Sequence, residues 1–172
     1  MIHCDVKICV GCKMCEVACS SYHFGAVSSA LSRIRVSKLE EIGIDMAITC
    51  LSCLEKPCMV CPTDAMTIGE KGEILIEEED CITCDLCMNG CPIGVVGFYD
   101  DLPLICDLCD GETSCVEACP SGALTYREDH KEISLAQFLK NEGHENLRRA
   151  IYVEAQAKPV RENWIAGGRV DS

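Results

Sequence analysis

The sequence lacks the features that mark most membrane, secreted or nucleic-acid-binding proteins. Its longest stretch without Asp, Glu, Lys or Arg, residues 17–32, is rich in Ser and Cys and therefore too polar to cross a bilayer. Only residues 1–8 precede the first regularly spaced cysteine, which leaves no room for a secretory signal, so a cytoplasmic location is expected. Basic residues are in deficit, and the formal charge of −13 argues against nucleic acid or an anionic membrane surface as a partner.

The chain also lacks the side-chain sets of an enzyme active site. Outside its cysteines it has no paired carboxylates, no nucleophile and base at a spacing typical of a catalytic pair, and no phosphate-binding loop. We therefore expect a protein that does not catalyse a reaction by itself. The four histidines show no spacing suited to metal binding and are interpreted as structural or surface residues: His3, His23, His130 and His144.

Cysteine is what the sequence has in excess, with 17 among 172 residues. A density of this kind indicates either a disulfide framework in a secreted protein or metal ligation in a reduced compartment, and the missing signal favours metal. Cys4 stands alone and is interpreted as a small, partly buried hydrophobic residue. The other sixteen form four groups: Cys9, Cys12, Cys15 and Cys19; Cys50, Cys53, Cys58 and Cys61; Cys81, Cys84, Cys87 and Cys91; Cys106, Cys109, Cys115 and Cys119.

The spacing within these groups predicts iron-sulfur clusters. Groups one and three have the C-x2-C-x2-C-x3-C run of bacterial ferredoxins, and groups two and four are looser variants. Three closely spaced cysteines can hold three corners of a cubane, whereas the fourth faces away and ligates another cluster, so the groups must work in pairs. Zinc ribbons also use C-x2-C pairs, but they seldom place three cysteines in successive three-residue steps. We expect four [4Fe-4S] clusters.

Short strands are expected between and after the groups. Residues 33–39 alternate polar and apolar side chains, as a strand with one wet face would. Residues 65–68 and 74–76 flank a glycine-containing turn and predict a hairpin. Residues 123–126 and 131–134 predict a second one.

The last part of the chain carries a helical pattern. Ser134 begins a capping-box sequence, and apolar residues follow at helical spacing through Leu139. A second helix is predicted over residues 145–157, ending before Pro159, and residues 160–172 form a tail.

Taken together, these motifs resemble the four-cluster electron-transfer subunits of molybdenum and tungsten oxidoreductases. The resemblance covers about residues 5–126 and is carried by the cysteine groups in their order, by Cys61-Pro62-Thr63-Asp64-Ala65 and by Cys119-Pro120-Ser121-Gly122-Ala123. The family usually has three residues between the last two cysteines of group two, whereas Cys58 and Cys61 here are separated by two.

The resemblance implies how the cysteines share the clusters. It implies four ligand sets: Cys9, Cys12, Cys15 and Cys119; Cys19, Cys106, Cys109 and Cys115; Cys61, Cys81, Cys84 and Cys87; Cys50, Cys53, Cys58 and Cys91. Electrons would pass along the sets in this order or its reverse.

The implied fold is α+β, with two nested bacterial two-[4Fe-4S] ferredoxin-like units, short hairpins and a helical C-terminal extension. The nested domain would span residues 1–133, with an outer unit from 1–30 and 100–133 and an inner unit from about 45–99, and the extension would span 134–172.

The implied partner is a large catalytic molybdenum- or tungsten-pterin subunit, joined in some complexes by a flavin or ferredoxin subunit. The short chain most resembles the small subunits of tungsten aldehyde oxidoreductases or of benzoyl-CoA reductase. Hydrogenase, formate dehydrogenase and carbon monoxide dehydrogenase complexes, or a free-standing polyferredoxin, are the alternatives.

Overall fold

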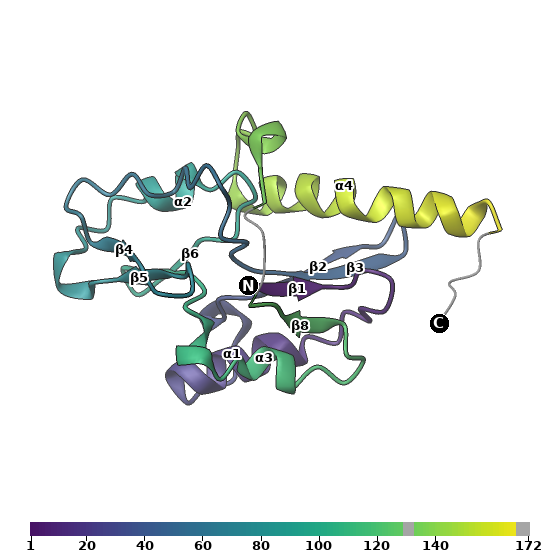
Figure 1. Cartoon of the computed structure of the whole chain (residues 1–172), viewed down its shortest axis with the longest axis horizontal. Coiled ribbons are helices and arrows are strands. Elements are labelled where there is room, and N and C mark those ends of the chain that lie inside the picture. Colours follow the sequence, from purple (N-terminus) through teal and green to yellow (C-terminus); the bar gives the residue numbers. More distant parts are fainter. Residues whose placement is uncertain (129–132, 168–172) are drawn as a thin grey trace.

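The structure, a computed structural model, describes residues 1–128 and 133–167 and combines small antiparallel sheets with short helices (Figure 1). The described residues contain four two-stranded antiparallel sheets. These pair β1 (Ile2–Cys4) with β8 (Leu124–Tyr126), β2 (Arg35–Leu39) with β3 (Ile44–Ile48), β4 (Met66–Ile68) with β5 (Ile74–Ile76), and β6 (Gly97–Tyr99) with β7 (Leu102–Leu104). The expected α+β class is confirmed, and the nesting of two ferredoxin-like units stays a prediction.

The helices are short except for the last one. They are α1 (Met14–Phe24), α2 (Leu86–Gly90), α3 (Ser114–Glu117) and α4 (Glu145–Ile165), with single 3-10 turns at Ser29–Leu31, Glu78–Asp80, Leu108–Gly111 and Ala136–Phe138. Three of the α-helices begin inside a cysteine group, because the chain leaves each cysteine loop through a turn of helix. No helix among the described residues combines the length and apolar character that a membrane crossing requires.

The strands agree with the sequence pattern in two places. The predicted β4–β5 hairpin is confirmed, and residues 33–39 contain β2. The strand at Leu124–Tyr126, β8, pairs with β1 from the opposite end of the chain, with Leu124 opposite Cys4, and the segment predicted to pair with it, residues 131–134, is only partly described. Lys131 and Glu132 lie outside the described residues. The N-terminal strand offers apolar Ile2, which is buried in this pairing.

The C-terminal part also departs from its prediction. The pattern from Ser134 yields one 3-10 turn, since the Ser134 hydroxyl accepts a hydrogen bond from the Ala136 amide and only Leu135 and Phe138 are buried in this turn. The predicted end of the last helix before Pro159 is wrong: α4 continues to Ile165. Proline deprives the carbonyl four residues earlier of its donor, but Pro159 and Ala155 are both exposed, so water can satisfy that carbonyl.

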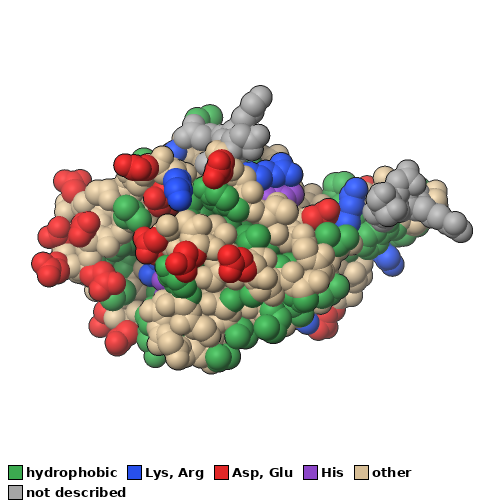
Figure 2. Space-filling model, turned by 60° about the horizontal axis from the view of Figure 1, so that its bottom comes forward, with side chains coloured by type: hydrophobic (Ala, Val, Ile, Leu, Met, Phe, Trp, Pro, Cys, Tyr) green, Lys and Arg blue, Asp and Glu red, His purple; other side chains and the backbone are tan. Residues whose placement is uncertain are grey.

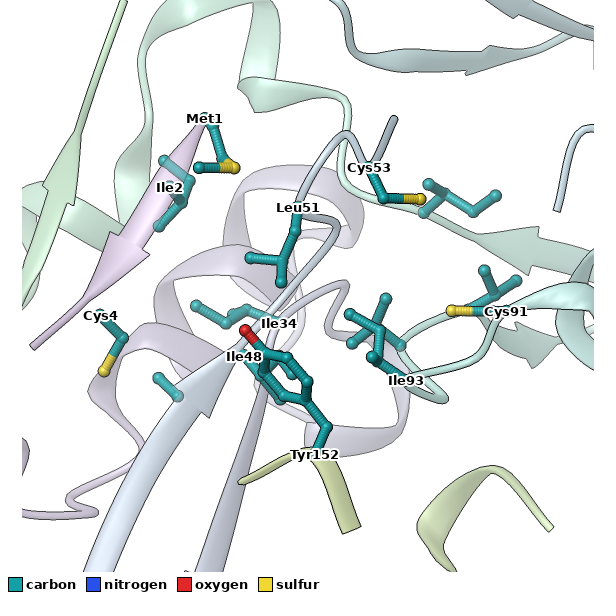
Figure 3. Packing of buried hydrophobic residues seen from close by; sticks show 14 of the residues in the cluster. Met1, Ile2, Cys4, Ile34, Ile48, Leu51, Cys53, Cys91, Ile93 and Tyr152 are labelled. Carbon is teal, nitrogen blue, oxygen red and sulfur yellow. The ribbon is translucent and has the colours of Figure 1, made fainter. Parts of the chain in front are cut away.

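The apolar core joins the cysteine groups to α4. The long helix lies along β2 and β3, with Val153 and Ala157 fully buried (Figure 1). Figure 3 shows Tyr152 of α4 beside Ile34 and Ile48, and the same cluster includes Cys53 and Cys91. The cysteines are therefore part of one continuous apolar core with the residues of the sheets and of α4.

Arg148 fixes α4 to the cysteine loops. Its guanidinium is buried and donates to three carbonyl oxygens at the end of α2: Asn89 at 2.7 Å, Cys91 at 2.8 Å and Met88 at 3.0 Å. Two of these carbonyls also accept a backbone amide, that of Met88 from Cys91 and that of Cys91 from Gly94, so Arg148 reinforces the turn that ends α2. The next residue, Arg149, donates to the Gly94 carbonyl. The C-terminal extension thus stabilises the backbone around group three.

Candidate metal centres

Three pockets of the structure are each lined by four cysteines from two different groups. The sets are Cys61, Cys81, Cys84 and Cys87; Cys19, Cys106, Cys109 and Cys115; and Cys50, Cys53, Cys58 and Cys91. In each set three cysteines come from one group, and the fourth is the last cysteine of another group. Three of the four predicted ligand sets are thus brought together in space.

Short helices explain why the last cysteine leaves its own group. Cys87 lies in α2 and Cys91 follows its end, so the two are carried to different sides of the turn. Cys19 lies on α1, which packs against α3, where Cys115 is located. The walls of two pockets are mostly apolar, as Ile74, Ile93 and Val96 show at the pocket of Cys50. The pocket of Cys109 also has polar and charged residues in its lining.

The structure brings together only part of the fourth predicted set. Cys9 and Cys12 are close enough to Cys15 for their charges to affect it. The Cys119 sulfur lies 3.7 Å from the Ser121 hydroxyl and faces the backbone amides of Ala123 and Leu124. Three members are therefore grouped, and the place of Cys119 in this set stays a prediction.

Cys4, which the sequence left unassigned, lies beside this set. It is buried, and its thiol lies close enough to the thiol of Cys9 for the two to raise and lower each other's pKa, with that of Cys4 raised and that of Cys9 lowered. Burial as a small apolar residue agrees with its interpretation, but contact with a predicted ligand was not visible in the sequence because Cys4 lies outside every regular spacing.

The four sets form a line, and its order differs from the predicted one. Cys15 interacts with Cys115, Cys106 with Cys50, and Cys58 with Cys87. The set of Cys50 therefore lies between the set of Cys106 and that of Cys84, whereas we expected it at the end of the line. The reason is that Cys50 and Cys106 both follow strands of the central sheets, so their loops meet in the middle of the molecule.

Only Cys12 and Cys84 are exposed among the seventeen cysteines. Cys12 belongs to the first set of the line and Cys84 to the last one. Both ends of the line therefore reach the surface, and its middle is enclosed.

All four loops share one backbone feature. The residue directly before the second cysteine has a positive φ in each group: Gly11 at 60°, Ser52 at 45°, Thr83 at 55° and Leu108 at 63°. Non-glycine residues rarely adopt this left-handed conformation unless the surroundings require it. Such turns are how a loop directs successive N–H groups to one concave side, an arrangement found at phosphate and iron-sulfur sites.

Burial controls the protonation of the enclosed thiols. It raises the pKa of Cys58 to about 12 and that of Cys87 to about 11, and it raises the pKa of Cys50 and Cys115 as well. Without a cation these thiols are neutral. Iron would replace their protons, since the thiolate is the form that binds metal. Four sulfurs in an apolar pocket fit an iron-sulfur cubane by the chemistry of the donor set.

A histidine that the sequence did not single out lies at the Cys109 pocket. His23 Nε2 is 3.6 Å from Cys109 Sγ and 3.4 Å from Asp107 Oδ1, and the other oxygen of Asp107 is paired with Arg33. His23, Asp107 and Cys109 offer ligand atoms that all lie within 4.8 Å of one another. Burial, together with the charge of Arg33, lowers the pKa of His23. No spacing signal could have found this residue, because it is 86 positions from Cys109.

The chain is similar to several curated electron-transfer proteins. It is 43% identical over 119 residues to the polyferredoxin-like subunit of an aliphatic sulfonate oxidoreductase of Pyrococcus furiosus, covering 64% of this chain and 66% of that protein. It is 39% identical over 135 residues to the electron transport protein YsaA of Escherichia coli, covering 84% of it. It is 34% identical to the thiosulfate reductase electron transfer subunit PhsB of Salmonella typhi, covering 78% of it.

Family models and solved structures give two further comparisons. No family model matches the sequence. Among solved structures, the active site complex BamBC of benzoyl coenzyme A reductase contains a chain that aligns over 97% of this one and 94% of its own length, with 24% identity and a TM-score of 0.45.

Proposed function

Since this chain belongs to the polyferredoxin-like, iron-sulfur electron-transfer subunits of oxidoreductases, we propose that it relays single electrons through four [4Fe-4S] clusters to or from a catalytic subunit. The observation that carries the proposal is the line of cysteine sets, three of them closed pockets of four sulfurs, with exposed cysteines at its two ends.

The ligand assignment follows the sets. We assign one cluster each to Cys9, Cys12, Cys15 and Cys119; to Cys19, Cys106, Cys109 and Cys115; to Cys50, Cys53, Cys58 and Cys91; and to Cys61, Cys81, Cys84 and Cys87. A bound cluster supplies one-electron redox chemistry. The chain supplies thiolates, apolar walls that exclude water and loop amides that face the sulfur atoms, and these groups tune the reduction potential.

Neighbouring sets approach each other, as Cys50 and Cys106 do. The line therefore offers an electron a path from the surface at Cys12 to the surface at Cys84 without passing through water. This supports a relay between two partners and gives no role to a substrate pocket.

The catalytic partner we propose is a tungsten-pterin subunit of the aldehyde oxidoreductase type. The proposal depends on the resemblance of this short chain with a helical extension to the small subunits of such enzymes. Benzoyl-CoA reductase, hydrogenase, formate dehydrogenase and carbon monoxide dehydrogenase subunits are the alternatives, and a flavin or ferredoxin subunit would complete the electron path.

Anaerobic purification from the native source tests both levels of the proposal. We expect about sixteen iron and sixteen sulfide per chain, as four cubanes require. A count near four zinc and no sulfide would overturn the cluster assignment. Tungsten in a co-purifying large subunit would support the partner, whereas nickel would replace it with a hydrogenase, and a lone monomer would indicate a free polyferredoxin.

A further inference from the structure

The surface near Cys84 carries a charge distribution that the relay by itself does not require. Between Gly72 and Tyr126 the sequence has twelve acidic residues and no Lys or Arg. This segment includes groups three and four and holds most of the net charge of −13. Figure 2 shows Asp and Glu side chains crowding the left-hand end of the molecule, where Figure 1 places β4, β5 and α2.

Acidic residues lie on both sides of the exposed cysteine. The 3-10 turn Glu78–Asp80 directly precedes Cys81, and its Asp80 carbonyl accepts a hydrogen bond from Thr63. On the other side, the turn between β6 and β7 contacts the loop, since the Thr83 hydroxyl donates to the Asp101 carbonyl at 3.2 Å. Glu78, Glu79 and Asp101 are all exposed.

The centre of this surface is apolar. Ile82 is 60% exposed and Leu86 is 44% exposed, and they lie on either side of Cys84 in the sequence. An apolar centre permits close contact above the buried sulfurs, and a charged rim orients whatever approaches. We call this surface, made of Glu78, Glu79, Ile82, Cys84, Leu86 and Asp101, the Cys84 face.

The other end of the line is different. Ile8, Val10 and Met14 are exposed around Cys12, and Lys7 and Lys13 are exposed in that loop. Acidic side chains are also present there, since Lys13 is paired with Glu16 at 3.6 Å and the Asp45 carboxylate lies beside Gly11. The two ends therefore differ in local charge: Cys12 has both lysines and acidic residues around it, whereas the exposed charges named around Cys84 are all acidic. This difference fits two different partners.

We propose that the Cys84 face is the docking site for a diffusible redox protein whose own contact surface carries Lys and Arg around an apolar centre. The inference rests on the proposed function. One electron moves from the reduced cluster site at Cys84 to the oxidised carrier, or in reverse, so that each partner changes by one charge.

Electrostatics favours a transient partner over a permanent subunit at this face. Exposed charges act mainly by accelerating encounter, are screened by salt and add little lasting affinity. Weak electron-transfer encounters also use small interfaces. A carrier that must arrive and leave repeatedly needs these properties.

The test uses the intact, dithionite-reduced holoprotein and horse cytochrome c as the basic redox probe. The variant is Glu78→Gln with Glu79→Gln, and the matched control is Glu40→Gln with Glu41→Gln, an equally exposed pair in the turn between β2 and β3. At low ionic strength we expect the first variant to lower the second-order electron-transfer rate at least threefold and the control to change it little. The difference should vanish at high salt.

A second probe distinguishes weaker docking of the carrier from damage to the cluster site. Ferricyanide is an anion, so its reduction by the Glu78 and Glu79 variant should be faster than by the native protein, whereas a damaged cluster site would slow both probes. Equal effects of the two variants on cytochrome c, or a rate indifferent to salt, would overturn the docking proposal while leaving the relay intact. A holoprotein that reduces neither probe would contradict the proposed function itself.

Discussion

His23 Nε2 lies 3.6 Å from Cys109 Sγ, although the two residues are 86 positions apart in the sequence. Asp107 holds the same ring nitrogen at 3.4 Å and is itself paired with Arg33. The histidine is therefore fixed in a buried position next to one predicted cluster ligand.

This contact predicts a change in one reduction potential. His23→Phe removes an N–H donor near Cys109 sulfur, so the reduced, more negative state loses stabilisation and the potential of that cluster should fall. His23→Gln retains a donor and should restore most of the native value. Redox titration followed by electron paramagnetic resonance measures this, and identical shifts in both variants would show that His23 acts only through packing.

Two double variants test whether the last cysteine of one group ligates the cluster of another group. The measurement is the iron content per chain. Cys58 and Cys91 line one pocket, whereas Cys87 and Cys91 come from the same group but line different pockets. Cys58→Ala with Cys91→Ala should therefore leave about twelve iron per chain, and Cys87→Ala with Cys91→Ala about eight. The reverse result would mean that each group holds its own cluster.

Arg148 should matter for stability far more than its place in the C-terminal extension suggests. Its guanidinium donates to three carbonyls at the end of α2, and hydrogen bonds from a charged donor are individually strong. We expect Arg148→Ala to lower the free energy of unfolding by about 3 kcal/mol, since the charged hydrogen bonds to all three carbonyls would be lost.

Two further variants serve as controls. One tests whether the positive charge alone accounts for the effect of Arg148, and the other tests the effect of removing a cation elsewhere on α4. Arg148→Lys keeps the charge but not the planar fork, and it should recover less than half of the loss. Lys158→Ala removes an exposed ion pair with Glu154 on the same helix and should have little effect. Thermal denaturation under anaerobic conditions measures all three, and equal melting temperatures for Arg148→Ala and Lys158→Ala would refute the assignment.

Gly11 and Gly25 allow the energetic cost of a left-handed backbone to be measured separately from the cost of a steric contact. Gly11 and Gly25 both have a φ near 60°, but a Cβ on Gly11 would lie 2.0 Å from an Asp45 carboxylate oxygen, whereas a Cβ on Gly25 would meet open space. Gly25→Ala should cost about 1 kcal/mol from the left-handed backbone alone.

Gly11→Ala should cost clearly more and also lower iron incorporation, because Gly11 precedes Cys12. Adding Asp45→Ala should recover the steric part of that loss. If the two glycine variants proved equally stable, the contact with Asp45 would have no energetic weight.

Much of the candidate site could be predicted because its signals are local. The spacing of Cys81, Cys84 and Cys87 places three sulfurs on one loop whatever the rest of the chain does. The β4–β5 hairpin is equally local, since its turn lies between two adjacent apolar runs. Other features depend on distant partners or on solvent exposure: β8 pairs with residues 2–4, and Pro159 is tolerated in α4 because the carbonyl that it frees lies on the exposed side of the helix.

The sequence by itself determined the number of cysteine groups and the spacing of the cysteines within them. Only the tertiary structure decided which set lies in the middle of the line, which cysteines reach the surface, and that His23 and Arg148 serve the cysteine loops. The physical reason is that ligand spacing is set along a few residues of backbone. The order and exposure of the sets depend on how α1, α2 and α4 pack across distances that no local pattern records.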